Sequence, residues 1–342
     1  MIRCDTIKWR TLSMNCMSYN PACFDVLTVS DAEGRLQTRI LRLQDKYKPQ
    51  GVSLINIDVI NCHITVEMSA KILGADYLDG IHAGNIHRVI ESLSVYKGNY
   101  TFRVDSVLES AFLLRCDVTD NLVVSRPVID YLNALSELRR NDKYSIDAYA
   151  GSVVLRRKVT SYKERLIVYN KVAELQRKDD HLYGILLRNG KLDGVRDRLL
   201  RVESNLTSYK QMRNLFGVDD SKCIVVGRAK CVPLLVALQS SNRVNYTLLK
   251  KATDMVMSDK LRSVSGSFTE IEKQIGRETI IRECNYDIEL IRSFIRQHVR
   301  GNVSCYVRRY KALMADMAAR EASQRVGDNH GLVAELLQLL AG

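Results

Sequence analysis

The sequence predicts a mixed α+β fold: an antiparallel-rich sheet with packed helices, followed by a smaller helical C-terminal part. Strand-like segments, in which apolar and polar residues alternate, recur through the first two thirds of the chain. Amphipathic segments and turn residues separate them. Beyond about residue 218, helical spacing dominates. We therefore predict two domains, residues 1–217 and residues 218–342.

The N-terminal part is predicted to form short strands and two helices. The elements, in order, are short strands within residues 1–50, a strand with a short helix at 61–74, and an amphipathic helix at 87–98. In NCHITVEMS polar residues alternate with apolar ones, so one face of this strand, with Glu67, is expected to be polar. Ser69 is expected to cap the short helix, and Gly98 to end the next one.

The middle of the chain repeats the strand pattern. The predicted elements are a strand at 112–121, a helix at 126–138, a hairpin of residues 144–158 and 164–171 across a basic loop, a strand at 198–209 and a helix closed by Gly217. Asp117 shares a strand face with Arg115, and Glu203 shares one with Arg201. FLLRCDV and RLLRVES are similar, but one short match is weak evidence for a duplication.

The composition is that of a basic globular chain of 342 residues. Its net charge of +12 favours an acidic partner such as nucleic acid, but suits a basic protein without such a partner equally well. Nine cysteines without a C-x-x-C pair argue against a disulfide scaffold or a structural zinc site, so we expect a reducing compartment. No apolar stretch is long enough to span a bilayer, and MIRCDTIKWR lacks an export signal.

Four strand-like segments each present an acid, or a tyrosine with a lysine, beside an apolar face. These residues are Glu67, Asp117, Tyr169 with Lys171, and Glu203. In LIVYNKVAELQRK, helix-favouring residues begin after Tyr169, so this tyrosine is expected at a strand end where a helix starts. Carboxylates on adjacent strands suit Mg²⁺ or Mn²⁺, and such a cation with Lys171 would favour the phenolate of Tyr169, a nucleophile for a phosphodiester.

Each of these residues also has an ordinary structural interpretation. A strand tyrosine is usually packed with its hydroxyl bonded, an Arg-x-Glu face is often a surface ion pair, and a lone glutamate is usually solvated. His63 has no second histidine at a metal-binding spacing, and His82 and His87 are five residues apart, which does not suit one helix face. We therefore interpret these histidines as structural or DNA-contacting residues before metal ligands.

Five segments occur in an order and spacing that match one protein family. They are VEMSAKILG, LLRCDVTD, VIDYL, LIVYNKVAELQ and LLRVESNLTSYKQMRNLFG. Together they resemble the gene II/gene X family of rolling-circle replication initiators from filamentous phages and related plasmids. The match covers roughly residues 55–220 and is strongest at LIVYNKVAELQ and LLRVESNL. The C-terminal helical part carries little resemblance.

The resemblance implies a catalytic nicking domain in residues 1–217 and a helical DNA-binding or accessory region in residues 218–342. Proteins of that family nick the plus strand of double-stranded replicative-form DNA at the origin, leave a 3′-hydroxyl primer and later rejoin the displaced strand. The family nucleophile is the tyrosine of the Y-x-K-x-x-E-L block, here Tyr169. Lys171 is then the candidate phosphate partner and Glu174 a nearby group.

Further residues receive roles from the same resemblance and from oxygen-ligand chemistry. Asp117 and Glu203 match the R-x-D and R-x-E blocks, and we predict them as Mg²⁺ (or Mn²⁺) ligands together with Glu174 and Glu67. The residues predicted to contact DNA are Arg115, Arg156, Arg157, Lys158, Arg201, Arg308, Arg309 and Lys311. The substitutes for the nucleophile, in order of preference, are Tyr162, Tyr149 and Tyr209.

The implied partners are double-stranded origin DNA, the displaced single strand, and the replication helicase and polymerase of a bacterial host, whose cytoplasm is the expected location; no membrane partner is expected. Two other functions stay open. One is an origin-binding protein without chemistry. The other is a metal-dependent DNA nuclease that uses water, with Tyr169 only stacking on a base. The origin sequence and the oligomeric state are not predicted.

Overall fold

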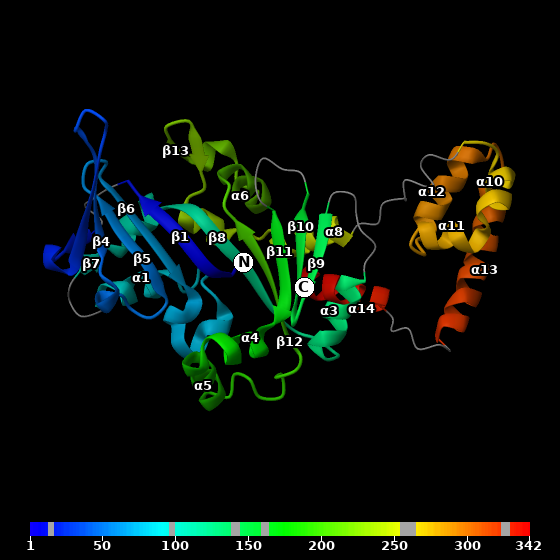
Figure 1. Cartoon of the computed structure of the whole chain (residues 1–342), viewed down its shortest axis with the longest axis horizontal. Coiled ribbons are helices and arrows are strands. Elements are labelled where there is room, and N and C mark those ends of the chain that lie inside the picture. Colours follow the sequence, from blue (N-terminus) through cyan, green and yellow to red (C-terminus); the bar gives the residue numbers. More distant parts are fainter. Residues whose placement is uncertain (13–16, 96–99, 138–143, 159–163, 254–264, 323–328) are drawn as a thin grey trace.

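A ten-stranded antiparallel sheet dominates the structure (Figure 1). This computed structural model describes residues 1–12, 17–95, 100–137, 144–158, 164–253, 265–322 and 329–342. The strand order is β3-β4-β5-β6-β1-β8-β12-β11-β10-β9, with antiparallel neighbours throughout. The predicted α+β class, with an antiparallel-rich sheet and packed helices, is confirmed.

The strands of the large sheet and of two small two-stranded sheets have the following bounds. The large sheet contains β1 (Cys4–Thr11), β3 (Phe24–Ser30), β4 (Leu36–Leu43), β5 (Val52–Asp58), β6 (His63–Ser69), β8 (Phe112–Val123), β9 (Tyr144–Tyr149), β10 (Ser152–Arg157), β11 (Arg165–Asn170) and β12 (Leu199–Leu206). The small sheets pair β2 (Met17–Tyr19) with β7 (Tyr100–Phe102), and β13 (Ile224–Val226) with β14 (Ala229–Cys231).

Helices fill the connections between the strands and most of the C-terminal third. The α-helices are α1 (Ile86–Val95), α2 (Val104–Ser110), α3 (Val128–Ser136), α4 (Lys171–Lys178), α5 (Asp180–Arg188), α6 (Tyr209–Phe216), α7 (Leu234–Gln239), α8 (Val244–Thr253), α10 (Phe268–Ile275), α11 (Arg277–Glu283), α12 (Ile288–His298), α13 (Val303–Ala322) and α14 (Asn329–Ala341). Short 3-10 helices are η2 (Pro21–Cys23), η3 (Asp45–Tyr47), η4 (Ala70–Asp79) and η5 (Asp220–Lys222).

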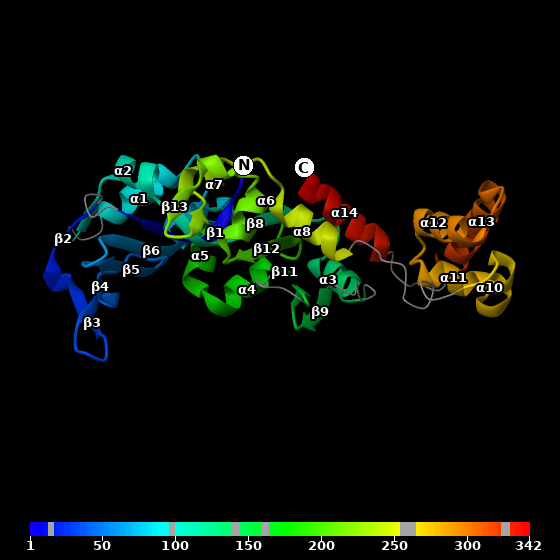
Figure 2. The same cartoon turned by 90° about the horizontal axis from the view of Figure 1, so that it is seen from above.

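The two faces of the sheet differ because each strand alternates apolar and polar residues. On β12, Val202 and Leu206 are buried on one face, while Arg201 and Glu203 belong to the other. The apolar face is covered by helices; Figure 2 shows α1, α2, α6 and α7 along one side of the sheet. Asn245 of α8 also bonds to strand groups on that face. The polar face is therefore the side on which charged side chains gather.

Several predicted elements differ from the structure in detail. The segment 144–158 is two strands, not one arm of a hairpin, because Gly151 adopts a φ of 81° and reverses the chain between β9 and β10. Ser69 makes no side-chain capping bond, and η4 that follows is a 3-10 helix. Gly217, at φ 65° and ψ 35°, ends α6 in the left-handed conformation as predicted. Gly98 lies outside the described residues.

The buried apolar side chains form two separate clusters. The first joins the sheet to its helices and includes residues beyond the predicted boundary at 217, such as Val218, Leu249 and Leu336. The second contains only residues between 268 and 317, from α10 to α13. The helix α14 lies against α3 and α8 (red in Figure 1), so the chain returns to the first cluster at its end. The boundary between the two clusters therefore lies later than residue 217, and β13 and β14 precede the helical cluster.

Candidate active site

Tyr169 lies near the end of β11, immediately before a helix begins. The side chain of Asn170 accepts a hydrogen bond from the amide of Ala173 and so caps α4. Across the sheet, Tyr169 is directly opposite Arg201 on β12 and Ser152 on β10. The local sequence explains this arrangement: an alternating β segment meets an Asn that caps a helix-favouring segment. The predicted strand-to-helix junction at Tyr169 is confirmed.

A pocket of about 680 Å³ opens at this junction. Tyr169, Lys171, Glu174 and Glu203, all predicted site residues, line it together. Its cationic lining residues are Lys71, Arg156, Arg165, Lys171, Arg177 and Lys178, and its carboxylates are Asp5, Glu174, Asp179 and Glu203. The six cations outnumber the four carboxylates, so the pocket favours an anionic ligand.

The hydroxyl of Tyr169 donates a hydrogen bond of 2.9 Å to Oε2 of Glu203 on the neighbouring strand. Burial is the main cause that raises the pKa of Tyr169, and the charge of Glu203 adds to the rise, while Arg201 opposes it. Burial also raises the pKa of Glu203, with the nearby Asp5 charge as the next cause. The tyrosine is thus held as a phenol, bonded to a carboxyl group that is more basic than an exposed glutamate.

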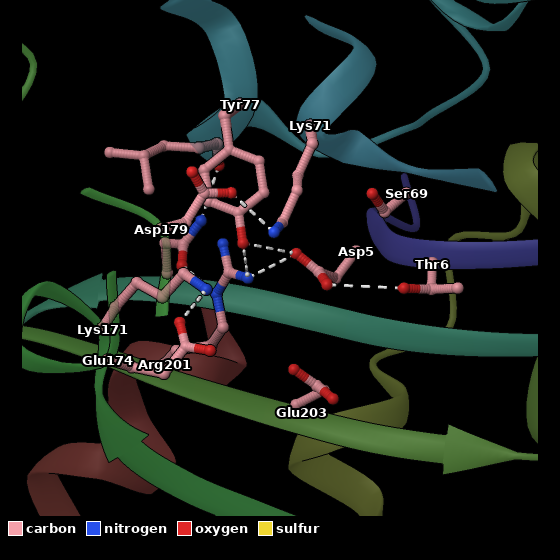
Figure 3. Close-up of polar contacts among 12 residues, drawn as sticks. Asp5, Thr6, Ser69, Lys71, Tyr77, Lys171, Glu174, Asp179, Arg201 and Glu203 are labelled. Carbon is pink, nitrogen blue, oxygen red and sulfur yellow. Dashed lines mark hydrogen bonds and ion pairs between the residues drawn. The ribbon is translucent and has the colours of Figure 1, made fainter. Parts of the chain in front are cut away.

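Arg201 organises a buried network beside this pair. Its Nη1 donates to Oδ1 of Asp5 at 2.5 Å and to the hydroxyl of Tyr77 at 3.0 Å, and its Nε donates to Asn121 at 2.7 Å. Figure 3 shows Asp5, Tyr77 and Arg201 joined in this way, with Lys171 and Glu174 beside them. Arg201 is fully buried and its Nη2 has no hydrogen-bond partner. One strong donor therefore remains unsatisfied next to the pocket.

Lys171 is the first residue of α4 and its ammonium is almost completely buried. Nζ is 2.7 Å from Oε2 of Glu174 and lies 4.9 Å and 5.5 Å from the ring centres of Tyr77 and Tyr169. Burial, followed by the charge of Arg201, lowers the pKa of Lys171 to about 8. This lysine can therefore hold or release a proton near neutral pH.

Asp5 and Tyr77 belong to this site, although the sequence analysis did not select them. Asp5 comes from β1, three strands away from β11 in the sheet order, and Tyr77 comes from η4. The polar side chains alternating in CDTIKWRT were the only available signal for Asp5. For Tyr77 no pattern in the sequence indicated the pocket.

The predicted metal ligands do not all gather at the pocket. Asp117 bonds to Arg115 at 2.9 Å and also accepts from Asn205. Glu67 lies 3.1 Å from Nζ of Lys8 and 3.5 Å from Arg115. Within the described residues, no three His, Cys, Asp or Glu side chains lie together as a metal site. The predicted carboxylates do not fit a preformed magnesium site, because Asp117, Glu67 and Glu174 pair with basic side chains and Glu203 accepts a hydrogen bond from Tyr169.

The predicted DNA-contacting residues lie in three places. Arg115 and Arg201 are on the polar sheet face, and Arg156 lines the pocket. Arg157 is 4.0 Å from the carboxylate of Glu164. Lys158, directly after β10, and Arg308, Arg309 and Lys311 on α13 are exposed.

The alternative tyrosines and the histidines are placed differently from Tyr169. Tyr149 lines the same pocket and is 56% exposed. Tyr209 lies on α6, outside that pocket, and Tyr162 lies outside the described residues. The three histidines interact with other groups: His63 is near Asp58 and Arg10, His82 accepts from the amide of Gly84, and His87 lies 3.8 Å from Asp105.

No protein-family model matches the chain, and no curated protein is significantly similar to it. None of the helices within the described residues is both long enough and apolar enough to cross a membrane.

Proposed function

We propose that the chain is a rolling-circle replication initiator that nicks one strand of origin DNA with Tyr169 and later rejoins the strand. The observation that carries the proposal is the hydrogen bond between Tyr169 and Glu203 in a pocket whose lining cations outnumber its carboxylates. A tyrosine at the end of a rigid strand, bonded to a basic carboxylate, has the geometry of a nucleophile with its general base. The resemblance of the ordered segments to those of phage and plasmid initiators supports the same reaction.

In the nicking step Tyr169 attacks the phosphorus of a phosphodiester. Because burial disfavours a free phenolate, the phenolic proton leaves during the attack and passes to the carboxylate of Glu203. The bond between Tyr169 Oη and phosphorus forms, and the bond from phosphorus to the 3′-oxygen breaks. The product is a 5′-phosphotyrosine and a free 3′-end.

Lys171 is placed to protonate the leaving 3′-oxygen. It lines the pocket beside Tyr169, and a pKa of about 8 allows it to act as an acid near neutral pH. Lys171, Ala173 and Glu174 of the first turn of α4 line the same pocket, and the N-terminal end of a helix favours a bound phosphate. Arg201, fully buried on the same sheet face beside the pocket, adds positive charge that stabilises the negative charge developing on the phosphate oxygens.

Rejoining uses the same groups in reverse. A 3′-hydroxyl gives its proton to neutral Lys171 and attacks the phosphotyrosine, while Glu203 returns its proton to the leaving phenolic oxygen. The energy of the original phosphodiester is kept in the phosphotyrosine, so no further co-reactant is needed. Retention of this bond energy distinguishes a nicking-closing enzyme from a nuclease that consumes water.

The requirement for Mg²⁺ or Mn²⁺ stays a prediction of the sequence. Within the part of the chain that the structure describes, no three His, Cys, Asp or Glu side chains are grouped as metal ligands, so nicking and rejoining are assigned to the side chains alone. The host cytoplasm and the host replication helicase and polymerase are proposed as the location and partners on the resemblance alone.

Covalent capture tests the proposal. Supercoiled DNA of the replicon that encodes this chain is incubated with the protein and Mg²⁺, and the products are separated on a denaturing gel. We expect a protein–DNA adduct with wild type and none with Tyr169→Phe. Tyr209→Phe, which changes a tyrosine outside the pocket, is the matched control and should keep the adduct. Nicking without any adduct would support the water-using nuclease, and binding without nicking would support the non-catalytic initiator.

A further inference from the structure

The two halves of the large sheet have the same topology. Reading outward from the centre, one half has the order β1, β6, β5, β4, β3 and the other has β8, β12, β11, β10, β9. In each half the first strand pairs with the last strand of a four-stranded meander. The central strands β1 and β8 are antiparallel, with Thr6 opposite Asp117. An approximate two-fold axis perpendicular to the sheet therefore relates the halves and leaves the polar side of both on one face.

The strand registers agree with this symmetry residue by residue. In the C-terminal half, directly opposed residues form the row Asn121, Arg201, Tyr169 and Ser152 from β8 to β10. In the N-terminal half the corresponding row, from β1 to β4, is Arg10, Thr65, Asn56 and Arg42. The adjacent row repeats as well: Glu203 is opposite Thr119 and Ile167, and Glu67 is opposite Lys8 and Leu54.

We call Arg10, Thr65, Asn56 and Arg42 the counterpart row. Asn56 takes the place of Tyr169, so the row has no nucleophile. Glu67, the equivalent of Glu203, is held by Lys8 and Arg115 rather than by a tyrosine. The counterpart row therefore lies at the position equivalent to that of the site but lacks the tyrosine and its bond to a glutamate.

The counterpart row has groups that suit a phosphate backbone. Within the described part of the chain, neither Arg10 nor Arg42 forms an ion pair, and Arg10 Nε donates 3.0 Å to the hydroxyl of Thr65. Asp25, opposite Arg42 on β3, accepts instead from Gln44. Two uncompensated cations with hydrogen-bonding neighbours in one line favour a polyanion over a single small ion.

We propose that the counterpart row binds the phosphate backbone of single-stranded DNA that continues from the Tyr169 pocket across the polar sheet face. The inference rests on the proposed function, since it takes the strand in the pocket as DNA. Five strand intervals, roughly 24 Å, separate Asn56 from Tyr169 across the strands. The rows are also offset along the strands by nine residues, roughly 30 Å, because Arg10 is opposite Phe112 of β8 and the other row starts at Asn121 of that strand. A strand long enough to cover this distance gains the second contact, and a very short one does not.

Binding of oligothymidylates to full-length protein tests this inference. All variants carry Tyr169→Phe to remove chemistry, and the oligonucleotides have about 4 and about 16 nucleotides, the usual range of site sizes. We expect Arg10→Ala/Arg42→Ala to lose most of the affinity that the longer oligonucleotide gains over the shorter one. For the longer one, the slope of log affinity against log salt should fall by about 1.4, because two contacts contribute about 0.7 each.

Arg39→Ala is the matched control, because Arg39 is exposed on the same strand β4 but on the side of the buried Leu41 and Leu43. It should keep both the affinity and the slope. Arg10→Ala removes the hydrogen bond to Thr65 and can destabilise β1, so a second variant changes only the exposed Arg42. Arg42→Glu should weaken binding of the longer oligonucleotide more than Arg42→Ala does.

Equal affinity and slope in the double variant and in Arg39→Ala would overturn the inference. An equal loss of affinity for the short and the long oligonucleotide would also overturn it, because the two arginines would then act only through non-specific electrostatic attraction. The proposed function fails separately: its failure is the absence of a covalent adduct with wild-type protein, whatever these binding curves show.

Discussion

Glu203→Gln is the substitution that most directly probes the proton transfer from Tyr169. The amide oxygen of glutamine can still accept the hydrogen bond from the tyrosine hydroxyl, so the geometry of the 2.9 Å contact is kept. The change removes the base and the negative charge. Nicking should therefore fall while the position of the nucleophile stays the same.

The expected loss is about 10²- to 10⁴-fold in the rate of adduct formation, the usual contribution of a positioned general base. This corresponds to about 2.7 to 5.4 kcal/mol of transition-state stabilisation at 1.36 kcal/mol per tenfold change. Because the Glu203 charge contributes to the raised pKa of Tyr169, its removal lowers that pKa. The variant should consequently recover part of its rate at high pH, where hydroxide takes the proton.

The folding stability of this variant should not fall. A carboxyl pKa that is raised in the folded state means that the folded protein binds the proton more tightly than the unfolded chain does. Ionised Glu203 therefore reduces stability as pH rises through and above its unfolded pKa, and glutamine removes this effect. A melting temperature equal to or above that of wild type at pH 7 would separate loss of the base from loss of the fold.

The assay is single-turnover adduct formation on a labelled single-stranded substrate from pH 6 to pH 10. Glu67→Gln is the matched control, because Glu67 occupies the equivalent register in the other half of the sheet but has no tyrosine partner. If Glu203→Gln loses no more activity than Glu67→Gln, Glu203 is not the base and the reasoning fails.

Three further predictions concern the lysine, the metal and the basic loop. In wild type, nicking should decline above pH about 8, and stability should rise between pH about 8 and 10.5, because the unfolded lysine binds more protons there than the folded one. Lys171→Met should lose both pH dependences. The pH–rate profile and pH-dependent melting check them, and profiles equal to those of wild type would contradict the role of Lys171. EDTA separates the metal-free steps derived above from the Mg²⁺ requirement predicted from the sequence: full activity in EDTA would support the former, and loss of nicking that added Mg²⁺ restores would support the latter. Arg156→Ala should reduce the salt slope for duplex DNA by up to about 0.9, because Arg156 lines the pocket, although its Nε is 3.4 Å from Asp147. Arg157→Ala should reduce it by less, because Arg157 does not line that pocket and is 4.0 Å from Glu164; equal, wild-type slopes would remove this end of β10 from the DNA interface.

Much of the fold follows from local patterns in the sequence. The alternation at 112–121 and 199–206 assigns Asp117 and Glu203 to the polar face of their strands, and the structure confirms both phases. The strand-to-helix junction at Tyr169 is also local, because Asn170 caps the helix that follows. Such features depend on residues only a few positions apart, so a single sequence contains them.

The parts that could not be predicted depend on contacts between distant strands. Asp5 joins the site because β1 lies at the centre of the sheet, a position that no property of CDTIKWRT reveals. For the same reason, Asp117 and Glu67 were grouped with Glu203 in one predicted metal site, although Arg115 bonds to both of them.

The symmetry between the two halves of the sheet also could not be predicted from local patterns. The similar segments FLLRCDV and RLLRVES lie in β8 and β12, which are paired strands of one half rather than equivalent strands of two halves. The structural counterpart of Glu203 is Glu67, and the shared letters around them, VE, are too few to detect. Topology and register, not sequence similarity, reveal the relation between the halves.

The most direct test of the account is to map the residue that becomes linked to DNA. Wild-type protein is trapped on a labelled single strand from its own replicon, digested, and the nucleotide-bearing peptide is identified by mass spectrometry. The account predicts one modified peptide, containing LIVYNK with the phosphate on Tyr169, and none in Tyr169→Phe. A nucleotide on Tyr149, which lines the same pocket, or cleavage with no modified peptide at all, would contradict it.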